Sequence, residues 1–277
     1  MNPYIKSPLN YVGGKYKLLN EIIPLFPENI NTFVDLFGGG LNVGINVKSD
    51  NVIYNDIEPH VVELMQYLKN TETQKLLTEI DELIVSYNLS KENSEGFLKL
   101  REYYNENNNS PIVFYTMLCY AFNYQIRFNQ NGKYNMPFGK DRSSFNPALR
   151  KKFITFVDEL HNKNIVFENT DFTNFNFSNL NSGDFVYCDP PYFNSVAAYN
   201  ENGGWTEEHE RELLNILTQL HNRGIKFALS NNLKYINPFL DEWKADYNVH
   251  YLNGDYSNCN YHKINRSKDV EVLITNY

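Results

Sequence analysis

Asp189-Pro190-Pro191-Tyr192 stand directly after a short apolar run that ends at Cys188, and these residues could hold a substrate. Two consecutive prolines fix the backbone and remove two N–H donors, which leaves carbonyl oxygens exposed as acceptors. Asp189 adds a carboxylate acceptor, and Tyr192 offers a flat face for stacking. Acceptors beside an aromatic plate suit a planar substrate with an exocyclic amino group, such as adenine or cytosine. Because ligands of open α/β sheets bind at the carboxyl ends of strands, a substrate site is favoured over a proline-rich surface turn.

A glycine turn forms a second candidate site. Asp35-Leu36-Phe37-Gly38-Gly39-Gly40 ends another apolar run, and glycines let the backbone approach a ligand closely and turn sharply. Asp56 ends the next apolar run, where its carboxylate could accept hydrogen bonds from the two hydroxyls of a ribose. The pair is typical of a nucleoside-binding unit, although a glycine turn without a ligand fits the pattern equally well.

The segment Asn10-Tyr11-Val12-Gly13-Gly14-Lys15 has some features of a phosphate-binding loop. That loop requires a glycine five residues before the Gly-Lys pair and a serine or threonine after it. Leu9 and Tyr16 occupy those two positions, so this interpretation is rejected.

A basic stretch lies within an acidic chain. The net charge is −8, but residues 121–152 carry seven basic residues against one acidic residue, a local net charge of +6 that leaves −14 for the rest. Such a stretch is a footprint for a polyanion, with a solvated surface loop as the alternative. Lys and Arg can bind phosphates, and Arg, Asn and Gln can also read base edges. The residues expected to contact nucleic acid are Asn123, Tyr124, Gln125, Arg127, Asn129, Lys133, Asn135, Lys140 and Arg142.

The spacing of apolar residues predicts the elements that position these side chains. Strands are predicted at 32–37, 51–54, 165–167, 184–188, 225–229, 249–251 and 270–275. Helices are predicted within 61–87 with a break near 70–71, over 111–122, and from 206 until Gly224. Strands alternating with helices indicate an α/β sheet with crossover connections. Because residues 57–160 add little to that sheet, we expect them to form an inserted, mainly helical lobe between 1–56 and 161–277.

Composition narrows the class of protein further. No apolar run approaches the roughly 20 residues of a membrane span, and Met1 to Asn10 lack the apolar core of a signal peptide, so we expect a cytoplasmic protein without a membrane partner. The six histidines show no helical pairing, so no metal is expected. Cys119, Cys188 and Cys259 have no paired spacing, which argues against a disulfide scaffold or a zinc ribbon.

Taken in order, these features resemble the Dam-type N6-adenine DNA methyltransferases of the alpha group. The matching pieces span nearly the whole chain: Tyr11 to Lys15, Phe33 to Gly40, Asn55-Asp56, Asn123 to Gly139, Gly183 to Tyr192, Leu229 to Asn231 and Ile274 to Tyr277. The resemblance implies a Rossmann-like S-adenosylmethionine-dependent methyltransferase sheet with an inserted DNA-recognition lobe. It also implies double-stranded DNA as substrate, with a monomer expected in solution and a dimer on DNA left open.

The resemblance assigns roles residue by residue. The expected cofactor-binding residues are Tyr11, Lys15, Asp35, Phe37, Gly38, Gly39, Asp56, Asp171, Phe172 and Asp189, with Asp171-Phe172 near the cofactor adenine. The residues expected to hold the target base are Asp189, Pro190, Pro191 and Tyr192. Arg127 falls where the family places an arginine that reads a guanine.

The chain departs from the family pattern at two places. The usual Pro-Phe-Xaa-Gly-Xaa-Gly turn is here Leu36-Phe37-Gly38-Gly39-Gly40-Leu41. Members that methylate GATC usually carry Gly-Leu where this chain has Tyr124-Gln125, and the leucine sits against a base. Since Gln125 offers hydrogen bonds instead, the target sequence stays open.

Two other functions remain as alternatives to a DNA adenine methyltransferase. An amino methyltransferase acting on RNA or protein glutamine shares the Pro-Pro-Tyr turn, but Asp189 and the basic stretch count against it. A catalytically silent DNA-binding module of the same fold is the other, and the intact Asp189, Tyr192 and Asp56 count against that. Transfer to an amino nitrogen needs no covalent intermediate, so Cys188 is interpreted as a core residue.

Overall fold

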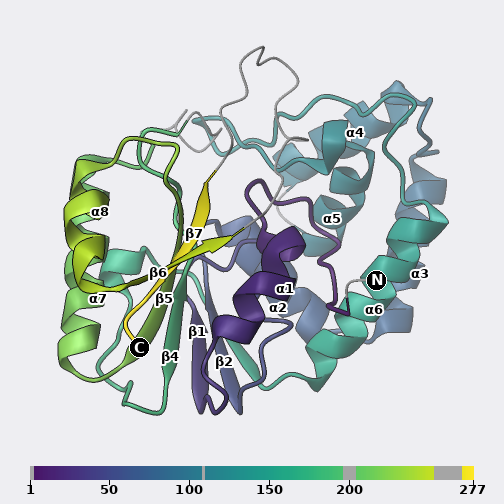
Figure 1. Cartoon of the computed structure of the whole chain (residues 1–277). Helices are drawn as coiled ribbons and strands as arrows, with labels where there is room; N and C mark the ends of the chain where they lie inside the picture. Colours follow the sequence, from purple (N-terminus) through teal and green to yellow (C-terminus); the bar gives the residue numbers. More distant parts are fainter. Residues whose placement is uncertain (1–2, 108–109, 196–203, 253–269) are drawn as a thin grey trace.

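The computed structural model describes residues 3–107, 110–195, 204–252 and 270–277 (Figure 1). Its described strands form one seven-stranded sheet in the order β3-β2-β1-β4-β5-β7-β6. The strands are β1 (Thr32–Asp35), β2 (Asn51–Asn55), β3 (Ile165–Glu168), β4 (Phe185–Cys188), β5 (Lys226–Asn232), β6 (Asn248–Leu252) and β7 (Glu271–Thr275). Every strand predicted from the sequence is therefore confirmed, with shifts of one to three residues at the ends.

The pairing of the strands confirms the predicted crossover sheet. β3, β2, β1, β4 and β5 are parallel, whereas β7 runs antiparallel to both β5 and β6. The strand order reverses at β1, because β2 and β3 lie on one side of it and β4 on the other. In open α/β sheets, such a switch point leaves a crevice outside the carboxyl ends of the strands, where ligands bind. The crevice between β1 and β4 is thus the expected place for a site.

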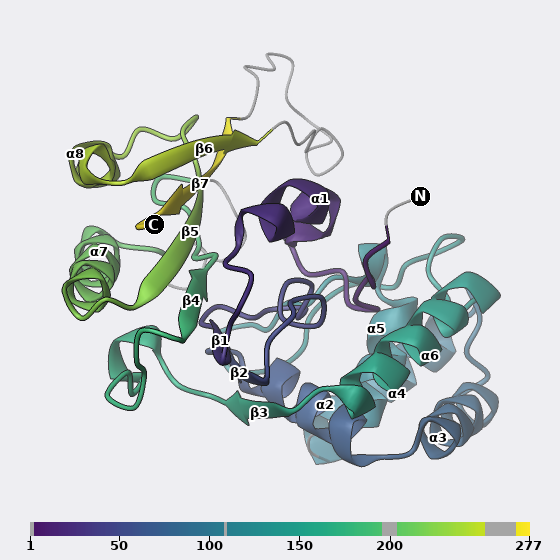
Figure 2. The same ribbon diagram turned by 60° about the horizontal axis from the view of Figure 1, so that its bottom comes forward.

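Helices cover the sheet in two groups (Figure 2). Those of the described residues are α1 (Leu19–Ile22), α2 (Pro59–Asn70), α3 (Thr73–Ser86), α4 (Ser94–Asn107), α5 (Pro111–Tyr120), α6 (Pro147–Asn162), α7 (Glu207–Asn222) and α8 (Pro238–Trp243). The helices α2 to α6 gather together beyond β2 and β3, and α7 and α8 lie on the other side of the sheet. The break near 70–71 and the end of α7 before Gly224, whose φ is +72°, are confirmed.

The sequence prediction omitted α1, α4, α6 and α8. The local sequence of α6 shows why that helix forms. The Asn146 side chain accepts a hydrogen bond from Leu149 N, and Pro147 occupies the first turn, where a missing N–H does no harm. Its buried residues, at helical spacing, are Leu149, Phe153, Phe156, Val157 and Leu160. These side chains join Phe33 of β1 and Val52 of β2 in one continuous apolar core, so the helical lobe shares its core with one face of the sheet.

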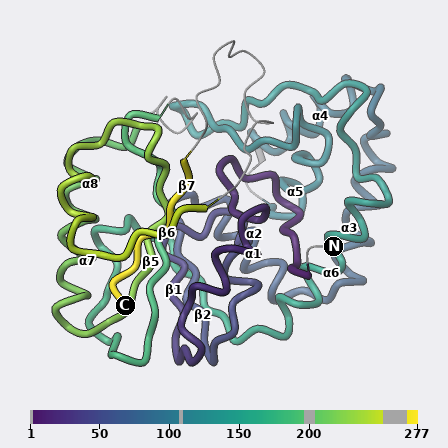
Figure 3. The backbone as a smooth tube through the Cα atoms, in the orientation of Figure 1, coloured from purple at the N-terminus to yellow at the C-terminus, as the bar shows by residue number. Residues whose placement is uncertain are grey.

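The chain start is tied by hydrogen bonds to two other parts of the chain. It leads to α1, which lies in front of the sheet in the view of Figure 3. Asn46 fixes this segment, because its side chain accepts from Ile5 N at 2.7 Å and donates to Ile5 O at 2.8 Å. Asn10 Nδ2 donates to Asn123 O at 2.7 Å, which joins the segment to the start of the basic stretch.

Candidate active site

Three acidic side chains meet at the carboxyl edge of the sheet. Asp35 ends β1, Asp56 follows β2 and Asp189 follows β4. Asp35 and Asp56 are 2% and 6% exposed. Burial raises the pKa of Asp35 to about 7, although a hydrogen bond from Gly44 N opposes this rise. Burial likewise raises the pKa of Asp56 and of Asp189. The edge is therefore a buried, acidic place that favours a positively charged ligand.

Lys15 is the cation that faces Asp189. Its ammonium lies 2.5 Å from Oδ1 and 2.6 Å from Oδ2 of that carboxylate, and it also donates to Gly13 O at 2.9 Å. The Lys15 side chain is only 3% exposed, and its charge lowers the pKa of Asp189 against the larger effect of burial. The Gly-Gly-Lys segment, rejected as a phosphate loop, thus belongs to the Asp-Pro-Pro-Tyr site.

Tyr192 lies beside the same pair. Lys15 Nζ is 5.2 Å from the centre of the Tyr192 ring. The Tyr192 hydroxyl donates to Glu271 Oε2 at 3.0 Å, and Glu271 Oε1 accepts from Asn232 Nδ2 at 2.8 Å. Glu271 is 4% exposed and comes from β7, at the far end of the sequence. Sequence reasoning missed Glu271, although an acidic residue opening an otherwise apolar strand was a signal for it.

The glycine turn is bound to Asp56. Oδ2 of Asp56 accepts from Gly39 N at 2.7 Å, Oδ1 accepts from Glu58 N at 2.9 Å, and the Tyr11 side chain adds a further hydrogen bond. Gly39 has a φ of +47°, in the left-handed region. A Cβ at Gly38 would lie 2.2 Å from Cε2 of Tyr54. Both positions therefore require glycine, one for its backbone and the other for space.

Aromatic rings gather next to the glycine turn. The ring of Phe37 lies 5.4 Å from Phe172 and 5.7 Å from Trp205, and Phe172 lies 5.2 Å from Trp205. Phe37 and Trp205 are half-buried. Asp171 caps the short helical turn at Phe172, because its Oδ1 accepts from Thr173 N at 2.9 Å. The structure thus brings Phe37, Asp171 and Phe172 together as expected and adds Trp205, which the sequence analysis did not identify.

A buried carboxylate holds Trp205 in place. Glu210 of α7 is 1% exposed, and its Oε2 accepts from the Trp205 indole N–H at 2.5 Å. Its Oε1 accepts from Asn237 Nδ2 at 2.7 Å. Burial raises the pKa of Glu210, and the two hydrogen bonds lower it. The hydrogen bond from its N–H to Glu210 therefore fixes the orientation of the Trp205 indole.

The basic stretch folds into a loop with its own internal bonds. Two isolated bridges, Ala121 to Phe138 and Phe128 to Tyr134, close it. Arg127 donates to Asn135 twice, and Asn129 Oδ1 accepts from the backbone of residues 131 and 133. Exposed side chains on this loop include Asn123, Arg127, Lys133, Lys140 and Arg142. The amides of Asn129 and Asn135 thus shape the loop, whatever else they bind.

Part of the basic charge is not in the loop. Arg150, Lys151 and Lys152 lie on α6, and both terminal nitrogens of Arg150 pair with the Asp81 carboxylate at 2.7 Å. Because this pair neutralises Arg150, the local net charge of the stretch overstates what it offers to a polyanion.

The described cysteines and carboxylates provide neither a nucleophile nor a metal centre. Cys119 and Cys188 are buried, which raises the pKa of Cys119 to about 12 and that of Cys188 well above its usual value. Cys259 lies outside the described residues.

No group of three or more His, Cys, Asp or Glu within the described ranges could hold a metal ion. None of the described helices is long and apolar enough to cross a membrane.

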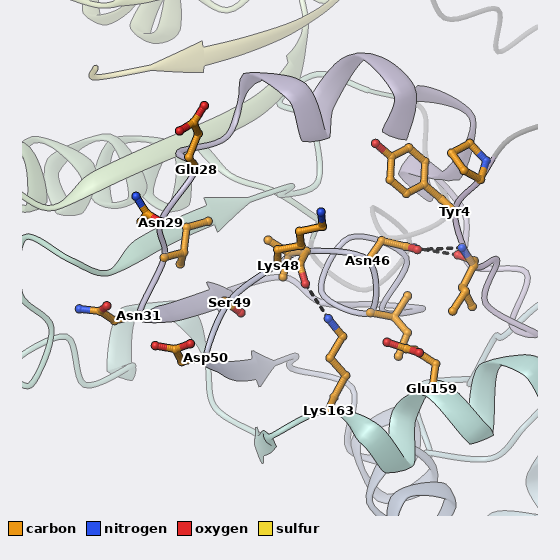
Figure 4. A pocket seen from close by; sticks show the side chains of 15 residues that line it. Tyr4, Glu28, Asn29, Asn31, Asn46, Lys48, Ser49, Asp50, Glu159 and Lys163 are labelled. Carbon is orange, nitrogen blue, oxygen red and sulfur yellow. Dashed lines mark hydrogen bonds between the residues drawn. The ribbon is translucent and has the colours of Figure 1, made fainter.

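A separate pocket opens at the opposite edge of the sheet (Figure 4). It encloses about 790 Å³ and is lined by residues that precede β1, β2 and β3, including Asn31, Asp50 and Lys163. Lys163 Nζ donates to Val47 O at 2.5 Å across it. These residues lie at the amino ends of the strands, so the pocket is no part of the acidic site.

Comparison with known proteins agrees with this geometry. The family described as D12 class N6 adenine-specific DNA methyltransferase matches residues 11–258. Type II methyltransferase M.FokI of Planomicrobium okeanokoites is 50% identical over 283 residues, covering 100% of this chain and 43% of the relative. Modification methylase StsI of Streptococcus sanguinis is 44% identical over 283 residues, covering 99% of this chain and 43% of the relative.

A shorter relative matches more of its own length. DNA adenine methylase of Escherichia coli (strain K12) is 26% identical over 232 residues, covering 81% of this chain and 80% of the relative. In contrast, this chain spans less than half the length of M.FokI and StsI. The match over residues 11–258 and the 50% identity confirm the resemblance seen in the sequence: the chain belongs to the D12 class of N6 adenine-specific DNA methyltransferases.

Proposed function

We propose that this chain transfers a methyl group from S-adenosylmethionine to N6 of an adenine that has been flipped out of duplex DNA. The observation that carries the proposal is the meeting of Asp189, Lys15 and Tyr192 at the carboxyl end of β4, next to the Asp56 and Gly39 pair. One half of this arrangement suits a planar amino base, and the other suits a nucleoside cofactor. Family membership supports both assignments.

The residues present fit S-adenosylmethionine. Asp56 and the glycine turn would hold the ribose, and the half-buried rings of Phe37 and Trp205, backed by the buried Phe172, offer aromatic faces for the adenine. When bound, the cofactor supplies a methyl group on a positively charged sulfonium. Its charge suits an edge where Asp35 and Asp56 are buried and Asp189 pairs with the ammonium of Lys15.

The chain's own groups would prepare the target amino group. Its lone pair is delocalised into the ring, so the nitrogen is a poor nucleophile. Asp189 and the Pro190 carbonyl would accept its two hydrogens and hold the lone pair towards the methyl group, while Tyr192 stacks on the base. Lys15 favours the ionised form of Asp189, because its ammonium lowers the pKa of that carboxyl against the larger effect of desolvation. The base must leave the duplex to reach these groups.

The inserted lobe would supply DNA recognition. We propose residues 57–160 as the recognition lobe and residues 1–56 and 161–277 as the catalytic domain. Support comes from the loop between Ala121 and Phe138, which carries exposed cations and is joined to the catalytic part by Asn10. Cations there would neutralise phosphates, and the loop side chains would read base edges.

A transfer assay tests the proposal. The protein is incubated with radiolabelled S-adenosylmethionine and duplex DNA, RNA or a glutamine-containing protein, and methylated DNA is then sequenced. We expect label on adenine of duplex DNA at one recurring sequence. Label on RNA or protein alone supports the alternative amino methyltransferase, and no transfer to any substrate supports the silent module.

Variants make the assay specific to the site. Asp189→Ala should lower kcat by far more than about tenfold, because a tenfold loss is only about 1.4 kcal/mol of barrier. Asp241→Ala is the matched control, since this exposed carboxylate on α8 contacts Lys244 far from the acidic edge. Equal activity of the two variants would remove Asp189 from the reaction.

A further inference from the structure

Glu271 is a buried acid whose position in the sheet is unusual. It is the first residue of β7, in register with Asn232 at the end of β5 and with Leu252 at the end of β6. Its side chain is 4% exposed, and burial raises its pKa. A carboxyl group buried at the end of three strands costs stability unless hydrogen bonds compensate. Each of its oxygens has such a bond, one with Asn232 and one with Tyr192.

The two hydrogen bonds of Glu271 connect it to different parts of the structure. Asn232 is part of the local turn, because its Oδ1 accepts from Lys234 N at 3.0 Å and from Val270 N at 3.3 Å. The bond from Asn232 to Oε1 therefore joins two neighbouring strands. The bond from Tyr192 to Oε2 crosses 79 residues of sequence and ends on the loop after β4. Only this second bond reaches the proposed base-binding groups.

Tyr192 is restrained from several sides. Its hydroxyl donates to Glu271, and its side chain also forms a hydrogen bond with Asp189. Lys15 Nζ lies 5.2 Å from its ring centre, and the Tyr235 ring lies 6.4 Å away at an angle of 47°. Pro191 limits the backbone before it. The hydroxyl oxygen lies on the axis about which the ring rotates, so a bond to it fixes the direction of that axis. A phenol O–H prefers the plane of its ring, so the same bond also restrains rotation of the ring plane. That plane decides whether a base can stack on it.

We infer that Glu271 is a positioning residue for the target base: from β7, it holds the Tyr192 ring in the orientation that receives the flipped adenine. The inference rests on the proposed function and assigns a role to a residue outside the Asp-Pro-Pro-Tyr segment. Two charged groups of the same site act on Glu271: Lys15 favours its ionised form, and Asp189 opposes it. Glu271 touches neither base nor methyl group and acts through Tyr192.

The test is a double-mutant cycle between Glu271 and Tyr192. Tyr192→Phe removes only the hydroxyl, and Glu271→Ala removes the acceptor. The DNA is a duplex in which 2-aminopurine replaces the target adenine found by sequencing. Its fluorescence rises when the base leaves the stack and falls again when the base stacks on an aromatic ring. Turnover is measured in parallel on the unmodified duplex.

We expect each single variant to leave the flipped 2-aminopurine brighter than the wild type does, and to lower kcat about tenfold with little change in KM for the cofactor. The double variant should lose less than the product of the two single losses, because both changes break the same Tyr192–Glu271 bond. Tyr192→Phe should cost more than Glu271→Ala, because it also removes the hydrogen bond between Tyr192 and Asp189. Glu271→Gln should restore much of the quenching, since its amide can still bond to both partners. Asn232→Ala is the control, because it removes the bond to Glu271 that joins β5 and β7 and leaves the Tyr192 bond in place. We expect it to lower thermal stability without brightening the bound 2-aminopurine.

Two results would overturn the inference while leaving the proposed function intact. One is full multiplication of the two losses in kcat, which would mean that Glu271 acts independently of Tyr192. The other is unchanged quenching in Glu271→Ala. Failure of the proposed function gives a different result, because the wild-type protein itself would then transfer no methyl group to DNA. The unfolding free energies of the same four proteins would still report whether the two side chains are coupled.

Discussion

The Arg127 guanidinium donates twice to Asn135: Nε donates to Asn135 Oδ1 at 2.7 Å and Nη2 donates to Asn135 O at 3.0 Å. Both residues were expected to contact DNA, yet here they bind each other. A guanidinium has five N–H donors, and this contact uses two of them. The remaining donors can still form a bidentate contact with a guanine, and the group is already oriented. We therefore regard Asn135 as the support for a base-reading arginine.

Arg127→Ala should relax discrimination at one base pair, because a bidentate arginine–guanine contact is worth about 1–3 kcal/mol. Asn135→Ala should give part of the same loss by releasing the guanidinium. Lys140→Ala is the matched control: it should weaken all DNA alike and shrink the salt slope by about one unit. The measurement is kcat/KM on cognate and singly substituted duplexes. If Arg127→Ala lowers activity equally on every site, the arginine only anchors the loop.

Asp56→Ala should weaken S-adenosylmethionine binding more than DNA binding. Charge-assisted hydrogen bonds contribute about 1.5–3 kcal/mol, and this carboxylate also holds Gly39 N in place. Calorimetric titration with S-adenosylhomocysteine measures the change directly, and Asp241→Ala serves again as the exposed control. Unchanged cofactor affinity in the Asp56 variant would exclude it from the site.

Trp205 gives the cofactor site an intrinsic fluorescent reporter. The chain contains two tryptophans, Trp205 among the aromatic rings next to the glycine turn and Trp243 packed on Phe227 and Tyr247 behind β5. We expect S-adenosylhomocysteine to change the emission of the Trp243→Phe variant, which keeps Trp205, and not that of Trp205→Phe. Glu210→Gln should reduce the change, because Glu210 fixes the indole. A response carried by Trp243 instead would place the adenine elsewhere.

Replacing Lys15 by methionine should move the acidic limb of the rate profile to higher pH. Burial raises the pKa of Asp189 and Lys15 lowers it, so loss of the ammonium raises this pKa further. The carboxylate accepts hydrogen bonds from the amino group only when ionised, so activity is lost as pH falls through that pKa. Measuring kcat from pH 5 to pH 9 checks the direction. An unshifted limb in Lys15→Met would show that Asp189 is not the group that titrates.

The sequence predicts the acidic residues at the strand ends of the site, but it does not predict the more distant residue Glu271. Asp35, Asp56 and Asp189 each end a recognisable apolar run, and parallel strands bring such ends together, so their meeting could be expected. Glu271 could not be placed in the same way. Its partner Tyr192 is 79 residues away, and the contact depends on β7 being inserted beside β5, which no local pattern shows.

Packing explains other things that spacing alone could not show. The need for glycine at position 38 comes from Tyr54 on the next strand, whose ring fills the space of a side chain. The sequence of α6 contains the signals of a helix, namely the Asn146-Pro147 start and apolar residues at helical spacing. Its omission from the prediction was therefore avoidable. Glu210 holds the Trp205 indole near Phe37 and Phe172, and Asn237 in turn donates to Glu210. The order of these residues in the sequence does not reveal this chain of contacts.

The position of β7 between β5 and β6 has a consequence for protein synthesis. A ribosome makes β5 and β6 first, yet neither pairs with the other, and both pair with β7. Until residues 271–275 emerge, β5 presents an unpaired backbone edge and β6 has no neighbour within the described sheet. Glu271 arrives with the same strand, so the Tyr192 ring is fixed only then. In a nascent chain, Asp35, Asp56 and Asp189 are therefore already synthesised while the Tyr192 ring, proposed to stack on the target base, is not yet held by Glu271.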